Sequence, residues 1–119
     1  MKIETKKIAQ RVALIARSKK AQKVVILDLK RVAAFCDYFV IAGAASKRQV
    51  NAVAQAIVED LKKLQLKPLS WPALNDESGW VVLDFNSVIV HVFYEPLREF
   101  YGLERLWSDA KKVRISPSA

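Results

Sequence analysis

Few side chains in this chain of 119 residues could carry out nucleophilic, acid–base or metal chemistry. His91 is the only histidine and Cys36 the only cysteine, so the usual number of zinc ligands cannot be assembled. Cys36 precedes an apolar segment, and we expect it to be a partly buried thiol that behaves as a small hydrophobe. A serine nucleophile would need Ser46 or Ser78 beside His91, but neither lies in a Gly-x-Ser-x-Gly setting.

Phosphate-binding chemistry is also not indicated. The three glycines stand at positions 43, 79 and 102, too far apart in sequence to form a glycine-rich phosphate loop. The sequence therefore predicts a protein without catalytic residues, metal or cofactor.

Length and composition predict one domain over residues 1–119, with a core at about 5–110 and a basic tail at 111–119. A hydrophobic content of 52% suits a modest core at this length. No apolar run is long enough to cross a bilayer, and the residues after Met1 do not resemble a signal peptide. We expect a cytoplasmic protein that does not contact membranes.

The net charge of +8 is concentrated at the two ends of the chain. The first 23 residues hold eight lysines and arginines against Glu4 alone, and three more basic residues follow position 110. Lys6, Lys7 and Arg11, on a predicted helix over residues 5–18, are therefore candidates for an auxiliary contact with a polyanion such as RNA. The alternative is a solvated helix face that keeps the protein soluble.

Hydrophobic periodicity predicts the order α, β, β, α, β, β, β, α. Residues 24–29 and 38–42 read as strands, the first of them buried on both faces. Ser46 and Gln49 form a capping box for a helix that ends near residue 65. A short extended piece is expected around Trp71, and residues 116–119 are expected to be a loose tail.

Residues 79–94 read as a β-hairpin with Asn86 and Ser87 in the turn, followed by a helix with Pro96 in its first turn. This register gives the hairpin two faces. The core face collects Val81, Leu83, Phe85, Val88, Val90 and Val92. The other face collects Trp80, Val82, Asp84, Ile89, His91 and Phe93, and two interpretations of it remain open. Either a helix covers it and Asp84 pairs with His91, or it contacts another protein.

Three segments resemble the ribosomal silencing factor family, also called the Iojap-like family. They are Val24–Leu29, Asp37–Gly43 with Ser46, and Gly79–Trp107. The resemblance covers about residues 5–110 and implies an α/β fold of the mixed α+β kind, in which helices flank a mixed five-stranded sheet similar to that of nucleotidyltransferases. Those enzymes hold two metal ions with carboxylates one residue apart. Here Lys30 follows Asp28 and Asn86 follows Asp84 at that spacing, so we expect the scaffold without the chemistry.

The resemblance also implies a partner, the fourteenth protein of the large ribosomal subunit, and a function, which is to block joining of the small subunit when nutrients are short. Related organellar members act in large-subunit assembly. The residues carried over for partner binding are Trp80, Asp84, His91, Arg98 and Tyr101, with Glu104 and Trp107 as rim or support. The same spacing would suit a helix that packs on the sheet, and exposed apolar surface near Trp80 would also suit a homodimer of the free protein.

Two departures from the family pattern affect the hairpin. The turn has Asn86-Ser87 in place of glycine and an acidic residue. The glycine expected before the hairpin is not recognisable in residues 71–75. An RNA-binding module is the main rival interpretation. It is less favoured because the aromatic residues lie in the near-neutral body while the lysines gather at the N-terminus.

Overall fold

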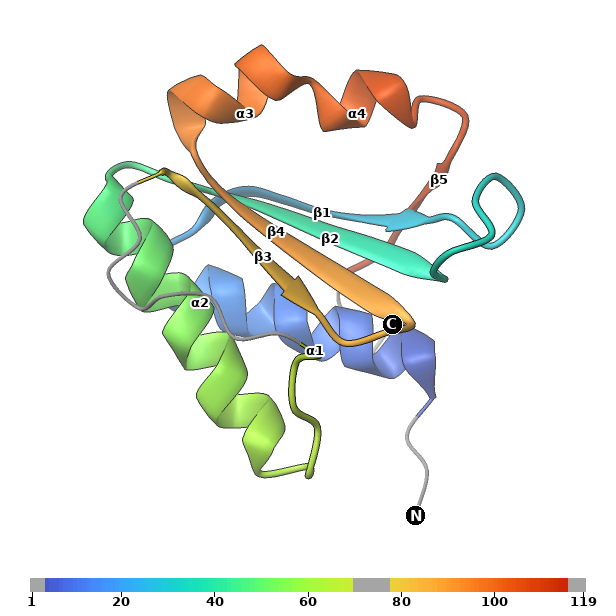
Figure 1. Cartoon of the computed structure of the whole chain (residues 1–119), viewed down its shortest axis with the longest axis horizontal. Coiled ribbons are helices and arrows are strands. Elements are labelled where there is room, and N and C mark those ends of the chain that lie inside the picture. The colour runs from blue at the N-terminus through green and yellow to red at the C-terminus, as the bar shows by residue number, and fades with distance from the viewer. Residues whose placement is uncertain (1–3, 70–77, 116–119) are drawn as a thin grey trace.

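The computed structural model describes residues 4–69 and 78–115, and of Tyr101 it describes the backbone alone. The elements in chain order are α1 (Thr5–Ser18), β1 (Gln22–Asp28), β2 (Tyr38–Ala44), α2 (Lys47–Lys62), β3 (Trp80–Asp84), β4 (Val88–Tyr94), α3 (Glu95–Tyr101), α4 (Leu103–Leu106) and β5 (Lys111–Val113). They form three layers, with α1 and α2 on one side of the sheet and α3 and α4 on the other (Figure 1).

The five strands form one mixed sheet in the order β3-β4-β2-β1-β5. β2 and β4 are parallel, and the other three pairs are antiparallel. The predicted fold class is therefore confirmed. All seven residues of β2 are buried. The predicted segment 24–29 is also covered on both faces, because Ile26 is buried in the core beneath α1 and α2 and Leu27 in the core beneath α3 and α4.

The fifth strand is not the one that the sequence predicted. The extended piece expected around Trp71 lies outside the described residues, as does the loose tail at 116–119. β5 instead comes from the segment assigned to a basic tail, and it pairs with β1 through Ile26 opposite Val113. Ile115, just beyond it, is buried in the main core.

Helices α1 and α2 form as predicted and cover the core face of the sheet. α1 packs mainly under β1 and β2, and α2 mainly under β4 and β3. The backbone N–H of Gln49 donates to the Ser46 hydroxyl over 3.1 Å, which confirms the predicted cap. The Gln49 side chain amide donates to the carbonyls of Lys19 and Lys20, and so joins the end of α1 to the start of α2.

The hairpin has the predicted register. Trp80 lies opposite Phe93, Val82 opposite His91 and Asp84 opposite Ile89. Asn86 adopts a φ of 74° in the turn, a left-handed conformation that asparagine tolerates better than most residues. The residues of the predicted core face pack with α1 and α2.

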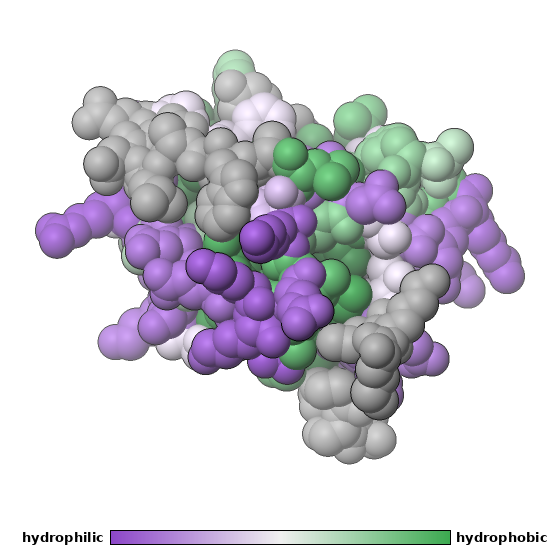
Figure 2. Space-filling view, turned by 60° about the horizontal axis from the view of Figure 1, so that its bottom comes forward, coloured by the Kyte–Doolittle hydropathy of each residue, from purple (hydrophilic) through white to green (hydrophobic). Residues whose placement is uncertain are grey.

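The side of the molecule formed by α1 and α2 is mainly hydrophilic on its surface, with apolar side chains visible between the polar ones (Figure 2). None of the described helices is both long and apolar enough to span a membrane.

Candidate protein interaction surface

The second face of the sheet is covered over β4 and β2 but not over the outer strand β3. Beneath α3 and α4, a smaller core gathers around Phe39, Ile41 and Phe93. This cover ends at β3, where Val82 is 38% exposed although it points to the same side as Phe93. Both interpretations of this face therefore hold in part, because one half lies under helices and the other half is open.

Trp80 lies at the border between the covered and the open half. Its ring is partly buried and stacks on Phe93, with ring centroids 5.0 Å apart. The residue before it fits closely under α3, because a Cβ added at Gly79 would lie 2.6 Å from Cδ1 of Leu97. Gly79 also has a φ of 82°, which favours glycine. Trp80 is therefore held rigidly next to α3.

The buried side chain of His91, on the neighbouring strand β4, fixes the orientation of the Trp80 ring. The indole Nε1–H of Trp80 donates to Nδ1 of His91 over 3.2 Å, so the neutral imidazole carries its proton on Nε2. The imidazole is 6% exposed, and burial lowers the pKa of His91 to about 4. Among the described residues, Nε2 has no hydrogen-bond partner and is buried. His91 was predicted as a partner-binding residue, but the structure places it beneath the surface, where it supports Trp80.

The predicted pairing of Asp84 with His91 is replaced by a local contact. The Asp84 carboxylate accepts a hydrogen bond of 2.8 Å from the backbone N–H of Asn86 and so stabilises the hairpin turn. Its side chain remains half-buried at the end of β3, on the same face as Val82. Asp84 therefore stays within reach of a partner.

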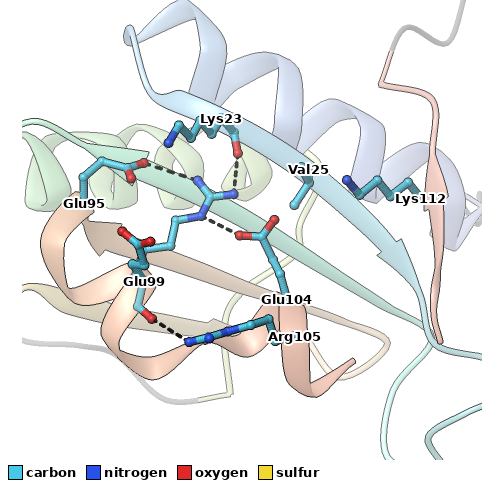
Figure 3. Close-up of a pocket in the computed structure, with 9 residues that line it drawn as sticks. Lys23, Val25, Glu95, Glu99, Glu104, Arg105 and Lys112 are labelled. Atoms are coloured by element: carbon cyan, nitrogen blue, oxygen red, sulfur yellow. Dashed lines mark hydrogen bonds and ion pairs between the residues drawn. The ribbon is translucent and has the colours of Figure 1, made fainter. Parts of the chain in front are cut away.

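Arg98 was also predicted as a partner-binding residue, and the structure shows it in a buried position. The side chain is 7% exposed. Its Nε donates to Glu104 over 2.8 Å and its Nη2 to the carbonyl of Lys23 over 2.6 Å (Figure 3). Nη1 donates to the carbonyl of Gln22 over 3.2 Å and approaches Glu95. Arg98 thus holds α3 and α4 against the start of β1, and its donors are directed into the protein.

The other residues predicted on the final helix divide between support and surface. Glu104 is partly exposed and bonded to Arg98. Trp107 is half-buried and contacts the rings of Phe35 and Phe39 at centroid distances of 5.8 and 6.1 Å. The side chain of Tyr101 lies outside what the structure describes.

Two apolar side chains on this layer were missed by the sequence analysis. Phe100 is 77% exposed and Leu106 is 70% exposed. Leu97, Leu103 and Trp107 pack inward. A single helical wheel would have placed Phe100 on that inner side, because it lies three residues from both Leu97 and Leu103. The helix instead breaks at Gly102, which has a φ of 60°, so the local pattern does not predict the exposure of Phe100. We define the β3–α3 surface as Trp80, Val82 and Asp84 on β3, with Phe100 on α3 and Leu106 at the end of the adjoining α4.

The basic residues predicted for RNA contact differ in their surroundings. Lys6 and Lys7 are exposed on α1. Arg11 forms an ion pair with Asp60 on α2, which engages its guanidinium within the protein.

The described residues show little that could perform catalysis. Cys36 is buried, and this burial raises the pKa of its thiol to about 11, so the reactive thiolate is scarce near neutral pH. Within residues 4–69 and 78–115, no three histidine, cysteine, aspartate or glutamate side chains come together to hold a metal ion.

Comparison with known proteins agrees with the resemblance seen in the sequence. The family model described as "Ribosomal silencing factor during starvation" matches residues 2–119. The ribosomal silencing factor of Bacillus subtilis is 36% identical over 107 residues, which are 88% of each chain. A mouse protein named for mitochondrial assembly of the ribosomal large subunit is 27% identical over 79% of this chain and 42% of its own length.

A solved structure confirms the fold independently. The crystal structure of a Chromobacterium violaceum protein superposes with a TM-score of 0.84, at 24% identity and over 89% of this chain and 88% of that one. With a family model that matches almost every residue and a bacterial relative aligned over most of both chains, the protein belongs to the ribosomal silencing factor family.

Proposed function

We propose that this protein binds the large ribosomal subunit through its fourteenth protein and thereby blocks joining of the small subunit. The observation that carries the proposal is the β3–α3 surface. It combines a rigidly held tryptophan with three apolar side chains, Val82, Phe100 and Leu106, that are between 38% and 77% exposed. An aromatic anchor among apolar neighbours is the usual composition of an energetic centre in a protein interface.

The mechanism is occlusion by a folded body. The domain measures 33 × 33 × 27 Å, and a protein of these dimensions on the joining face leaves no room for the small subunit. Binding and blocking then need no chemical step. Such a block in the cytoplasm would lower translation when nutrients are short.

A role in assembly of the large subunit is a second candidate, and the name of the mouse relative favours it. Both roles begin with the same contact to the large subunit. They differ in timing, since an assembly factor would bind immature subunits and leave once they are complete.

The proposed role is non-enzymatic. Asp28 and Asp84 stand without a second carboxylate two residues further on. In addition, the Asp84 carboxylate is engaged by the hairpin turn. Metal-dependent transfer or hydrolysis of nucleotides by the wild type that Asp84→Asn abolishes would overturn this part of the proposal.

Sedimentation through a sucrose gradient tests the proposal. We expect the protein to migrate with free mature large subunits and to be absent from joined ribosomes, and we expect it to slow the joining of purified subunits. Migration with immature subunits alone would favour the assembly role. Binding to joined ribosomes, or a free protein whose β3–α3 surface is closed by a stable homodimer, would contradict occlusion through this surface.

A further inference from the structure

The basic residues of the two chain ends meet along one edge of the sheet. β5 pairs with β1, which places Lys112 opposite Leu27 and Lys111 opposite Asp28. The side chain amide of Gln10 donates to the carbonyl of Arg114 over 2.9 Å and so ties α1 to the end of β5. The N-terminal and C-terminal charge clusters, separated by most of the sequence, therefore lie on the same side of the molecule.

We define the β5 rim as eight exposed basic residues along this edge. They are Lys6, Arg17, Lys23, Lys30, Arg31, Lys111, Lys112 and Arg114. Lys23 and Lys112 line one pocket (Figure 3). Lys30, Arg31 and Lys111 line a second pocket. Lys6 and Arg17 lie four and seven residues from Gln10 and so share its flank of α1.

Carboxylates beside the rim are largely engaged within the protein. Glu95 and Glu104 are bonded to Arg98. Asp28 accepts from the backbone N–H of Lys30 and lies 4.0 Å from the ammonium group of the same residue. Asp109 is the other carboxylate of the second pocket. Glu99 is the remaining carboxylate of the first pocket. With Asp28, Asp109 and Glu99 counted against the eight basic residues, the rim keeps a net positive charge.

We infer that the β5 rim binds the phosphate backbone of duplex RNA. The residues that line the two pockets include no aromatic ring, and charge without aromatic rings contacts phosphates and does not read bases. Among the described residues that line the two pockets, Val32 is the one exposed large apolar side chain, which is too little to anchor the rim in a lipid surface.

The inference rests on the proposed function, because a protein bound to a ribosomal subunit has RNA within reach. The strand order places β5, which carries Lys111 and Lys112, and β3, which carries Val82, at opposite edges of the sheet. Four strand spacings separate those edges, or about 19 Å. One molecule can therefore hold a ribosomal protein at one edge and RNA at the other.

Neutralising the rim tests the inference. The double variant Lys111→Gln, Lys112→Gln removes two exposed charges from β5. Its matched control, Lys62→Gln, Lys63→Gln, removes two exposed charges near the end of α2. The probe is an RNA duplex of about 20 base pairs, and the measurement is its affinity by fluorescence anisotropy between about 50 and 200 mM salt.

We expect the slope of log affinity against log salt to fall in magnitude by about two for the rim variant. The control variant should keep the wild-type slope. Equal losses in both variants, or a wild type that prefers anionic vesicles to RNA, would overturn the inference.

A second measurement separates this inference from the proposed function. The isolated fourteenth protein of the large subunit carries no RNA, so its affinity does not depend on an RNA contact. We therefore expect the rim variant to bind this protein with the wild-type affinity. If the wild type binds RNA through the rim but does not bind that protein, the proposed function is contradicted and the inference of RNA binding by the rim is supported. If the wild type binds that protein but the rim variant keeps full affinity for RNA, the inference of RNA binding by the rim is contradicted and the proposed function is supported.

Discussion

His91 shows how one buried side chain can prepare a surface without being part of it. The imidazole accepts the Trp80 indole N–H and lies edge-on to Phe39, with ring centroids 4.5 Å apart. Both contacts need the neutral ring, because a protonated Nδ1 could not accept and a charge would be buried among aromatic rings. The orientation of Trp80 is thus coupled to the protonation state of His91.

The stability of the protein should fall in mild acid because of His91. Burial lowers the pKa in the folded state to about 4, while the unfolded chain titrates near 6.5. The unfolded state therefore binds the proton first, and stability present above about pH 6.5 is lost as the pH falls towards 4. The loss amounts to about 3 kcal/mol.

Urea unfolding at a series of pH values checks this expectation. His91→Asn keeps an acceptor near Nδ1 but cannot titrate, so its stability should change less with pH than that of the wild type. Parallel pH profiles for the two proteins would show that His91 is not the group responsible.

At the scale of elements, Arg98 connects three pieces of the chain. It lies on α3, bonds to Glu104 on α4, and donates to the carbonyls of Gln22 and Lys23. β1 has an irregular register between Gln22 and Val25, and Lys23 has a φ of 47°. Arg98 therefore stabilises a β-bulge and fixes the helices that carry Phe100 and Leu106.

Arg98→Ala should lower the free energy of unfolding by about 3 kcal/mol, because it removes a buried guanidinium that donates to Glu104 and to two backbone carbonyls. Arg105→Ala is the matched control. Arg105 is exposed and makes one hydrogen bond of 3.3 Å to the carbonyl of Glu99, so we expect a change below about 0.5 kcal/mol. Chemical denaturation measures both. An Arg98→Ala protein of full stability that no longer binds the large subunit would return Arg98 to the contact surface.

The elements that the sequence predicted are those with strong local signals. The hairpin register followed from strict alternation around a two-residue turn, and the start of α2 followed from Ser46 and Gln49. β5 was not predicted, because three residues, two of them lysines, give no strand pattern. Its partner β1 also lies far away in the sequence. Arg98 was assigned to partner binding by the family resemblance alone. Its burial could not be predicted, because its carbonyl acceptors lie 75 and 76 residues away, a distance at which local patterns carry no information.

At the scale of the whole molecule, the sheet separates two kinds of surface. Its β3 edge carries Trp80 and Val82 and is supported from within by His91, and its β5 edge is basic and joins both chain ends. Figure 1 shows α3 and α4 lying across the face between them. Under the two proposals above, this separation would allow one small domain to bind a ribosomal protein and RNA at the same time.

The most direct test of the central claim compares two apolar residues of equal exposure. Val82 on the β3–α3 surface is 38% exposed, and Leu14 on α1 is 39% exposed. Val82→Glu and Leu14→Glu each add one carboxylate to the protein surface, and circular dichroism checks that both variants fold. The measurement is the affinity of each variant for the isolated fourteenth protein of the large subunit.

We predict that Val82→Glu loses about 2 kcal/mol of binding free energy, or about thirtyfold in affinity, because it places a charge at the centre of an apolar contact. Leu14→Glu should bind within about threefold of the wild type, as expected for a residue outside the interface. Equal affinities for the two variants, or a loss confined to Leu14→Glu, would contradict binding through the β3–α3 surface.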